Sequence, residues 1–213
     1  MLQEAYRQGI KTIIATPHYR QGQDIEHLKE LTVILRHEAQ KLEPGYGIFL
    51  GQELMDSEEI VEELRRGRAL TMAGSSFVLI EFLPGVSYRR MYQRLRQLQS
   101  AGYIPIVAHA ERYECLREGN RLEELKESGH LIQMNYRSLG GSIFNKNTQW
   151  CRRQILKGNI HLLGTDMHNT GTRAPKTEEA LSWLGRHCSK GELYRMVKKY
   201  PECILNKKEG IAG

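Results

Sequence analysis

Short apolar runs alternate with amphipathic segments along the whole chain. The runs are rich in aliphatic and β-branched residues, as buried parallel strands are, and they cover residues 10–15, 46–50, 77–80, 103–108, 130–134 and 159–163. Between them the apolar residues recur at helical spacing, which predicts helices over residues 24–42, 57–66, 87–99, 121–128, 145–157 and 177–187. Gly102, Gly129 and Gly158 stand where three of these helices should end.

The longest predicted helix has a clear apolar face. Residues 24–42 place five aliphatic side chains on one side, the arrangement of a helix that packs on a core: Ile25, Leu28, Leu31, Ile34 and Leu35.

Each apolar run is followed by a polar residue or pair. These are His18, Glu53, Glu81, His109, Asn135, and Asp166 with His168. They recur roughly every 30 residues, the length of one β/α barrel unit, which predicts parallel strands joined by right-handed helical crossovers. An open doubly wound sheet shows the same alternation, but it gathers functional side chains at one switch point. Polar residues after every strand therefore favour a single α/β barrel domain over residues 1–213.

Composition narrows the class of protein. Hydrophobic residues make up 40% of the 213 residues, enough for a core. The chain has no apolar run of about 18 residues and no basic-then-apolar leader, so we expect neither membrane insertion nor a signal peptide. The four cysteines form no C-x-x-C pair, which indicates reduced thiols and a cytoplasmic location. The net charge of +6 favours anionic partners, but no basic run interleaves with aromatics, so nucleic acid is not expected.

The residues after the strands carry the candidate chemistry. In a barrel the carboxyl ends of the strands converge on one face. Crowded carboxylates at Glu53, Glu81 and Asp166 would repel one another unless a cation joined them. Asp166 and His168 are two residues apart, so their side chains face the same side of an extended chain. Imidazole and carboxylate ligands suit manganese, iron or zinc, whereas the absence of thiolates argues against a structural zinc site.

Two arginines closely follow candidate ligands. Arg112 comes three residues after His109, and Arg173 comes five residues after His168. Because a guanidinium grips phosphate oxygens in a bidentate manner, both arginines are candidate phosphate clamps. The alternative for Arg112 is a surface ion pair with a neighbouring glutamate.

One other pair of residues matches the spacing of a known phosphate-binding loop. Cys115 and Arg121 match C-x5-R, the loop spacing of cysteine-dependent tyrosine phosphatases. That chemistry needs a thiolate in a cradle of backbone N–H groups, and Glu118 inside the loop would oppose phosphate. The spacing is therefore disfavoured as a catalytic loop.

The strand-end motifs together resemble those of the PHP (polymerase and histidinol phosphatase) superfamily. More narrowly, they are similar to the bacterial manganese-dependent tyrosine-protein phosphatases of capsular and exopolysaccharide biosynthesis. The resemblance extends from Ala5 to about Leu205 and rests on Thr16-Pro17-His18, Gly51-Gln52-Glu53, Leu79-Ile80-Glu81-Phe82, Ala108-His109-Ala110-Glu111-Arg112 and Asp166-Met167-His168-Asn169.

The resemblance implies a fold, a cofactor and a substrate. The fold is a distorted TIM-like (β/α)7 barrel. The cofactor is a cluster of up to three Mn²⁺ ions, with iron, zinc or Mg²⁺ as replacements, and its implied ligands are His18, Glu53, Glu81, His109, Asp166 and His168. Arg112 and Arg173 would contact phosphate, with His168 beside them in the catalytic set. The implied substrate is phosphotyrosine on a bacterial tyrosine kinase that regulates capsular or exopolysaccharide synthesis.

One departure from the family pattern changes the expectation. The family opens with a strand that carries an H-x-H motif, and no H-x-H occurs in this chain. We therefore expect a barrel that lacks its first strand, edge strands at residues 10–15 and 160–163, and fewer than three metal ions. Two alternatives stay open: a weak or inactive remnant that binds metal or a kinase tail, and a phosphatase for a small molecule such as histidinol phosphate. The oligomeric state is also open.

Overall fold

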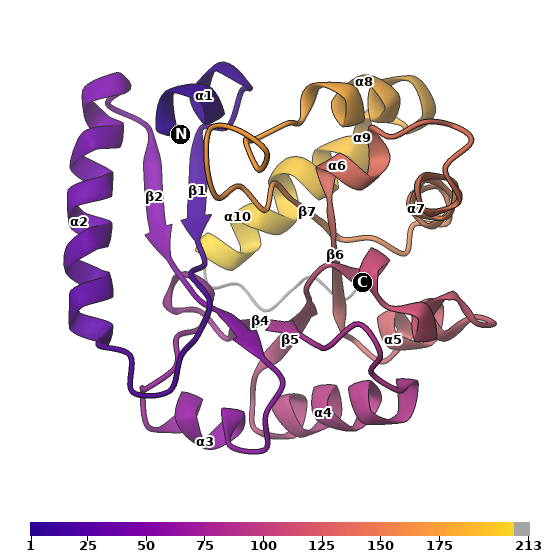
Figure 1. The fold of residues 1–213 in the computed structure, drawn as a ribbon, viewed down its shortest axis with the longest axis horizontal. Helices are drawn as coiled ribbons and strands as arrows, with labels where there is room; N and C mark the ends of the chain where they lie inside the picture. The colour runs from indigo at the N-terminus through magenta and orange to yellow at the C-terminus, as the bar shows by residue number, and fades with distance from the viewer. Residues whose placement is uncertain (207–213) are drawn as a thin grey trace.

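Parallel strands form the centre of the computed structural model, which describes residues 1–206 (Figure 1). The strands are β1 (Thr12–Ala15), β2 (Gly47–Leu50), β3 (Glu53–Met55), β4 (Phe77–Glu81), β5 (Ile104–Val107), β6 (Leu131–Asn135) and β7 (Leu162–Gly164). They form a two-stranded sheet, β1-β2, and a five-stranded sheet in the order β3-β4-β5-β6-β7. The parallel pairing predicted from the alternation is confirmed.

Helices connect the strands and surround them. The α-helices are α1 (Leu2–Arg7), α2 (Ile25–Leu42), α3 (Ile60–Arg65), α4 (Tyr88–Ser100), α5 (Arg121–Glu127), α6 (Tyr136–Leu139), α7 (Lys146–Leu156), α8 (Glu178–His187), α9 (Lys190–Tyr194) and α10 (Tyr200–Leu205). Short 3-10 helices are η1 (Met72–Gly74), η2 (Ala110–Arg112) and η3 (Glu114–Arg117), and a π-helical turn, η4 (Arg195–Lys199), joins α9 to α10. No helix within residues 1–206 combines the length and apolarity that crossing a membrane would require.

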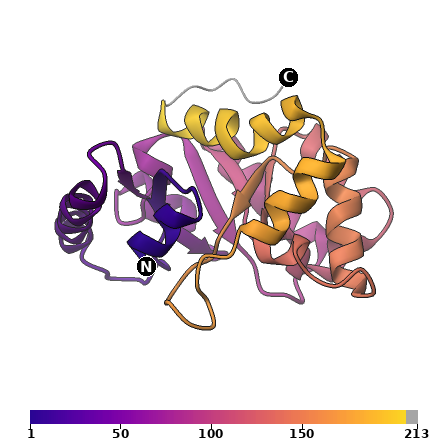
Figure 2. The same ribbon diagram turned by 90° about the horizontal axis from the view of Figure 1, so that it is seen from above.

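The five-stranded sheet is buried on both faces, as expected for parallel strands. One apolar cluster lies between this sheet and the surrounding helices and includes Leu54, Ile80 and Val107. The other lies on the opposite face and includes Phe77, Leu79, Ile106, Leu131 and Leu162, with Ile204 of α10 packed against them. In Figure 2 the C-terminal helices cross one end of the strands, and the loop that follows β7 projects at the other end.

Local sequence signals account for the helix boundaries. Asp24 caps α2 by accepting a hydrogen bond from the His27 amide, and Ser87 caps α4 in the same way. Gly102 and Gly129 follow α4 and α5 with φ of 89° and 84°, a left-handed conformation that costs glycine little. The predicted stops at these glycines are confirmed.

The predicted inward face of α2 is wrong. Leu31, Ile34 and Leu35 are 41%, 58% and 41% exposed, whereas the buried positions of this helix are Thr32 and Ala39. The small side chains let α2 approach β2 closely, and the Arg36 guanidinium donates two hydrogen bonds to the Ile48 carbonyl. Periodicity identified the helix, but it did not identify the side that faces the sheet.

A strand that the sequence did not predict positions the site. The apolar run at 46–50 gives β2, but the chain then bends at Gly51 and Gln52 and resumes as β3, which pairs with β4. Gln52 is fully buried, and its side-chain oxygen accepts a hydrogen bond from the Leu70 amide. The bend therefore carries the same segment from one sheet into the other.

The barrel expectation is only partly met. The two sheets meet at a single bridge between His18 and Glu53, and within residues 1–206 no strand ladder joins β7 to β1. β1 and β7 each lie at one end of the strand order, as expected. The structure thus establishes an α/β fold with parallel sheets.

Candidate metal centre

A histidine and two glutamates meet at one edge of the sheets: His18 follows β1, Glu53 follows β2 as the first residue of β3, and Glu81 is the last residue of β4. Ligand atoms of His18, Glu53 and Glu81 all lie within 4.8 Å of one another. His18 Nδ1 is 3.4 Å from Glu53 Oε2 and 3.9 Å from Glu81 Oε2. Both glutamates are buried, while the His18 side chain is half-exposed. Two buried carboxylates beside one imidazole form a donor set that fits a divalent cation.

His109 joins this group from the end of β5. Its Nε2 is 2.7 Å from Glu53 Oε1, and its Nδ1 is 3.0 Å from Asn135 Oδ1. Because an amide oxygen only accepts hydrogen bonds, Nδ1 carries the proton and Nε2 is directed at the carboxylate. Burial lowers the pKa of His109, but the Glu53 carboxylate more than offsets this, so the pKa is raised overall.

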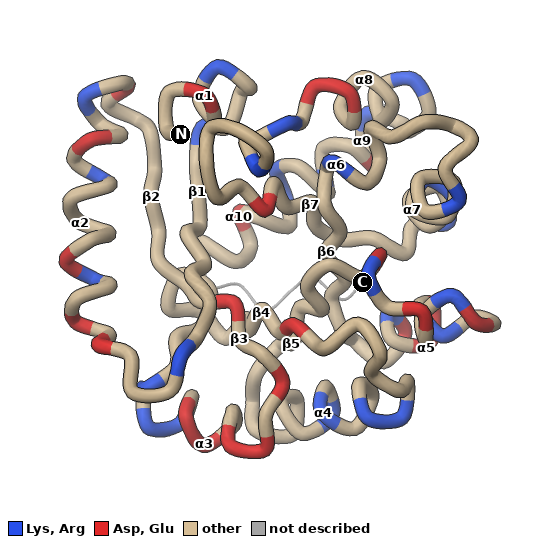
Figure 3. The backbone as a smooth tube through the Cα atoms, viewed as in Figure 1, with Lys and Arg blue, Asp and Glu red and all other residues tan. Residues whose placement is uncertain are grey.

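The second half of the site follows β7. Asp166 adopts the left-handed conformation, with φ of 49°. Its Oδ1 is 3.6 Å from His168 Nδ1, and the His168 ring lies 6.0 Å from the His18 ring, centroid to centroid. The two halves of the site are therefore neighbours. Figure 3 shows acidic positions next to the β3, β4 and β5 labels, near the middle of the molecule.

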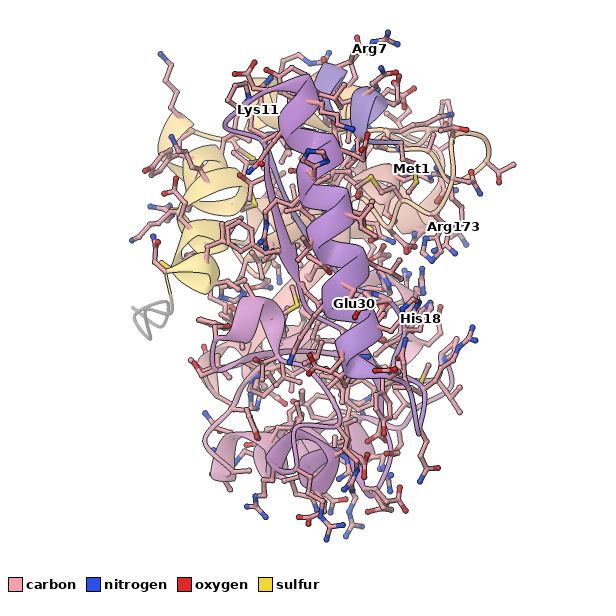
Figure 4. All side chains as sticks on the ribbon, turned by 90° about the vertical axis from the view of Figure 1, so that its left-hand side faces the viewer. Met1, Arg7, Lys11, His18, Glu30 and Arg173 are labelled. Atoms are coloured by element: carbon pink, nitrogen blue, oxygen red, sulfur yellow. The ribbon has the colours of Figure 1, made fainter. Side chains whose placement is uncertain are left out.

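The two arginines bind the carboxylates. Arg112 donates to Glu81 Oε1 at 2.7 Å and to Asp166 Oδ2 at 2.8 Å. Arg173 donates to Asp166 Oδ1 at 2.5 Å, and Figure 4 shows Arg173 on the same side of the molecule as His18. Burial alone would raise the pKa of Asp166, but Arg173 and the neighbouring cationic groups hold that pKa below its usual range. The predicted alternative, in which Arg112 pairs with an adjacent surface glutamate, is not what the structure shows.

All the residues predicted as metal ligands or phosphate clamps are thus brought together. Contacts under 4 Å connect His18, Glu53, Glu81 and His109 on one side, and Arg112 links Glu81 to Asp166 on the other. His168 lies at the exposed rim with its side chain 39% exposed. Their roles as ligands and clamps remain predictions, because proximity alone does not assign them.

Gln133 and Glu111 lie behind the site, and the sequence did not predict a role for either of them there. Gln133 Oε1 accepts a hydrogen bond from the His109 amide at 2.7 Å, and Gln133 Nε2 donates to Asn135 Oδ1 at 3.1 Å. Buried Glu111 accepts hydrogen bonds from the Asn135 amide and the Ser138 hydroxyl. The sequence held one signal for this network, the position of Asn135 after an apolar run, but that position alone did not assign Asn135 a role.

The surroundings of Cys115 do not suit a catalytic cysteine. The thiol is buried, and burial raises its pKa, so a thiolate is disfavoured. Arg121 donates to the Cys115 carbonyl and pairs with Glu118. The arginine is therefore engaged with the loop itself and does not cradle a phosphate above the sulfur.

Comparison with known proteins places this chain. A family described as capsular polysaccharide synthesis, CpsB/CapC, matches residues 1–206. The chain belongs to the CpsB/CapC family. This confirms the resemblance found in the strand-end motifs.

Individual members of the CpsB/CapC family agree with this assignment. The tyrosine-protein phosphatase YwqE of Bacillus subtilis is 33% identical over 96% of this chain and 82% of its own length. The tyrosine-protein phosphatase CpsB of Streptococcus agalactiae is 30% identical over 96% of this chain and 88% of its own length. The fold matches a chain from the crystal structures of YwqE and of CpsB from Streptococcus pneumoniae, described as metal-dependent tyrosine phosphatases, with a TM-score of 0.86 and 31% identity. That match covers 97% of this chain and 85% of the other.

Proposed function

We propose that this protein is a metal-dependent tyrosine-protein phosphatase that hydrolyses phosphotyrosine on a bacterial tyrosine kinase of capsular or exopolysaccharide synthesis. The observation that carries the proposal is the convergence of His18, Glu53 and Glu81 around one point, with Arg112 beside them. Membership of the CpsB/CapC family and likeness to tyrosine phosphatases support the substrate class.

The candidate ligands would hold Mn²⁺ or a similar divalent ion. They are His18, Glu53, Glu81, His109, Asp166 and His168. A bound ion would lower the pKa of a coordinated water and so supply hydroxide near neutral pH. The mixture of carboxylate and imidazole donors suits manganese, iron or zinc.

The arginines would bind the phosphate. Arg112 and Arg173 now neutralise Glu81 and Asp166. With these carboxylates neutralised by a bound cation, both guanidiniums would be free to hold phosphate oxygens and to neutralise charge during attack on phosphorus. Tyrosine phenolate is a better leaving group than an alkoxide, since the pKa of the tyrosine phenol is about 10, so no separate general acid is required.

The fold supports the placement of this chemistry at one mouth of a barrel. The His18–Glu53 bridge joins the two sheets at the site, and every candidate ligand lies at, or a few residues after, the carboxyl end of a strand, which for Glu53 is β2. We infer a PHP-type barrel that works in the cytoplasm, where its kinase substrate would present phosphotyrosine.

The substrate class can be tested directly. The protein with Mn²⁺ should release phosphate from a phosphotyrosine peptide with a kcat/KM well above that for histidinol phosphate. A preference for histidinol phosphate would replace the proposed substrate with a small molecule. Stoichiometric metal and peptide binding without phosphate release would indicate a non-catalytic binding protein instead.

A further inference from the structure

Met55 shares the face of the sheet that carries the metal-site glutamates. In the β3-β4 ladder Glu53 is paired with Leu79, and Met55 is paired with Glu81. Paired residues of neighbouring strands point to the same side of a sheet, and successive residues of one strand point to opposite sides. Leu54 belongs to the cluster beneath the helices, so Glu53 and Met55 both face the other way, into the mouth.

Met55 also lies nearer to solvent than the glutamate below it. Two residues of strand span roughly 7 Å, and exposure rises from 5% at Glu53 to 39% at Met55. Leu83 comes two residues after Glu81, the last residue of β4; it is 69% exposed and opens a turn closed by a hydrogen bond from the Val86 amide to the Leu83 carbonyl. Met55 and Leu83 are thus two exposed apolar side chains at, or just after, the carboxyl ends of β3 and β4, and we call this pair the aryl shelf.

The other side of the same mouth is charged. Arg112 reaches Glu81 and Asp166 from beyond β5, and β4 lies between β3 and β5 in the sheet. Met55 and Arg112 therefore flank Glu81 from opposite sides. The phosphate group of a bound ester would lie between the arginines and the cation held by the glutamates. Its organic group would then project outward, past the level of Glu81, beside the aryl shelf.

We propose that Met55 and Leu83 bind the aromatic ring of the phosphotyrosine side chain and so select aryl phosphates over alkyl phosphates; this rests on the proposed function. A methionine thioether makes favourable contacts with aromatic rings and adapts its shape to them. A phosphoserine side chain has no ring to reach the shelf, so it gains nothing from these two residues.

The test uses two ligands that share a phosphonate group. Calorimetry would measure binding of benzylphosphonate and methylphosphonate to the Mn²⁺-loaded protein and to its Met55→Ala/Leu83→Ala double variant. The control is Val33→Ala, at an exposed position on α2. We expect the unaltered protein and the control to prefer benzylphosphonate by about tenfold, equivalent to about 1.4 kcal/mol. The double variant should lose this preference with methylphosphonate affinity unchanged.

Kinetics separate failure of the aryl shelf from failure of the proposed function. In the double variant KM for a phosphotyrosine peptide should rise about tenfold with kcat nearly unchanged. If the double variant keeps its preference for benzylphosphonate, or loses affinity for both ligands equally, the proposed role of the aryl shelf is overturned. Hydrolysis of the phosphotyrosine peptide by the unaltered protein would still uphold the proposed function. If the metal-loaded unaltered protein hydrolyses no aryl phosphate, the proposed function falls and the inference falls with it.

Discussion

The two sheets of this protein contribute to the candidate site in different ways. The β1-β2 sheet with α2 packs around a small apolar cluster of Ala39, Tyr46 and Ile48, and it supplies a half-exposed candidate ligand, His18. The β3–β7 sheet is enclosed by large apolar clusters on both faces and supplies buried Glu53, Glu81 and His109. The buried candidate ligands thus lie in the more extensively packed sheet, which indicates that the larger sheet sets the geometry of the site and the smaller one completes it.

The largest expected effect contrasts one candidate ligand from each sheet. His109→Ala should lower kcat/KM for a phosphotyrosine peptide about 1,000-fold, because it removes a buried ligand fixed by Asn135 and Glu53. His18→Ala should cost about 100-fold. His37→Ala, on the exposed side of α2, is the control. A larger loss for His18→Ala would reverse the comparison.

Core substitutions should show the same contrast in stability. Ile80 and Ile48 are 0% and 2% exposed. Ile80→Ala should lower the free energy of unfolding by about 4 kcal/mol, because well-packed neighbours cannot collapse into the cavity. Ile48→Ala should cost about 2 kcal/mol, since its smaller cluster can relax. Urea unfolding measures both, and equal costs would show that the two sheets are equally well packed.

Lowering the pH should first destabilise the larger sheet. Burial lowers the pKa of His130 and of His161 to about 4, and the His161 Nδ1 atom accepts a hydrogen bond from the Ile132 amide. Between pH 6.5 and pH 4, both imidazoles stay neutral in the folded protein but take up protons in the unfolded chain. Their contribution to stability is therefore complete above pH 6.5 and is lost as the pH falls toward 4, by up to about 3 kcal/mol per histidine.

A single substitution isolates the share of His130. Among residues 1–206, neither ring nitrogen of this buried side chain has a hydrogen-bond partner. In the presence of a chelator, His130→Leu should reduce the loss of stability between pH 7 and pH 5, as measured by urea unfolding. His27→Leu, at an exposed position on α2, should leave that loss unchanged. An unaltered pH dependence in His130→Leu would show that other groups control acid sensitivity.

The smallest expected effect concerns the support behind the site. Asn135→Leu should weaken Mn²⁺ binding about 10-fold to 100-fold, because His109 loses the oxygen that fixes its tautomer. Asn135→Asp keeps an acceptor oxygen and should retain more of the affinity. Calorimetric titration of both variants checks this, and equal affinity in the two would remove Asn135 from the positioning role.

Much of the fold could be predicted from the sequence, and the reasons for the exceptions are physical. The apolar runs identify β1, β2 and β4 to β7, because buried parallel strands need continuous apolar side chains. The strand β3 was missed because Glu53 ends an apolar run, and only pairing with β4 makes this polar segment a strand. The predicted inward side of α2 was wrong because the small side chains of Ala39 and Thr32 let the helix approach the sheet. Hydrophobic periodicity does not reveal this approach.

The site shows the same division. Strand-end position was enough to gather His18, Glu53, Glu81, His109 and Asp166, since parallel strands bring their carboxyl ends together. The roles of Gln133 and Glu111 depend on contacts between β5, β6 and the turns that follow them. Such contacts join residues far apart in sequence and have no local pattern.

The central claim is that bound metal at these strand ends drives phosphotyrosine hydrolysis. The most direct measurement follows phosphate release from a phosphotyrosine peptide, together with the metal content of the protein, before chelation, after chelation and after Mn²⁺ is restored. We predict that activity disappears with the metal and returns with it, and that His109→Ala recovers neither. Activity that persists in metal-free protein, or a metal-saturated protein that releases no phosphate, would contradict the account.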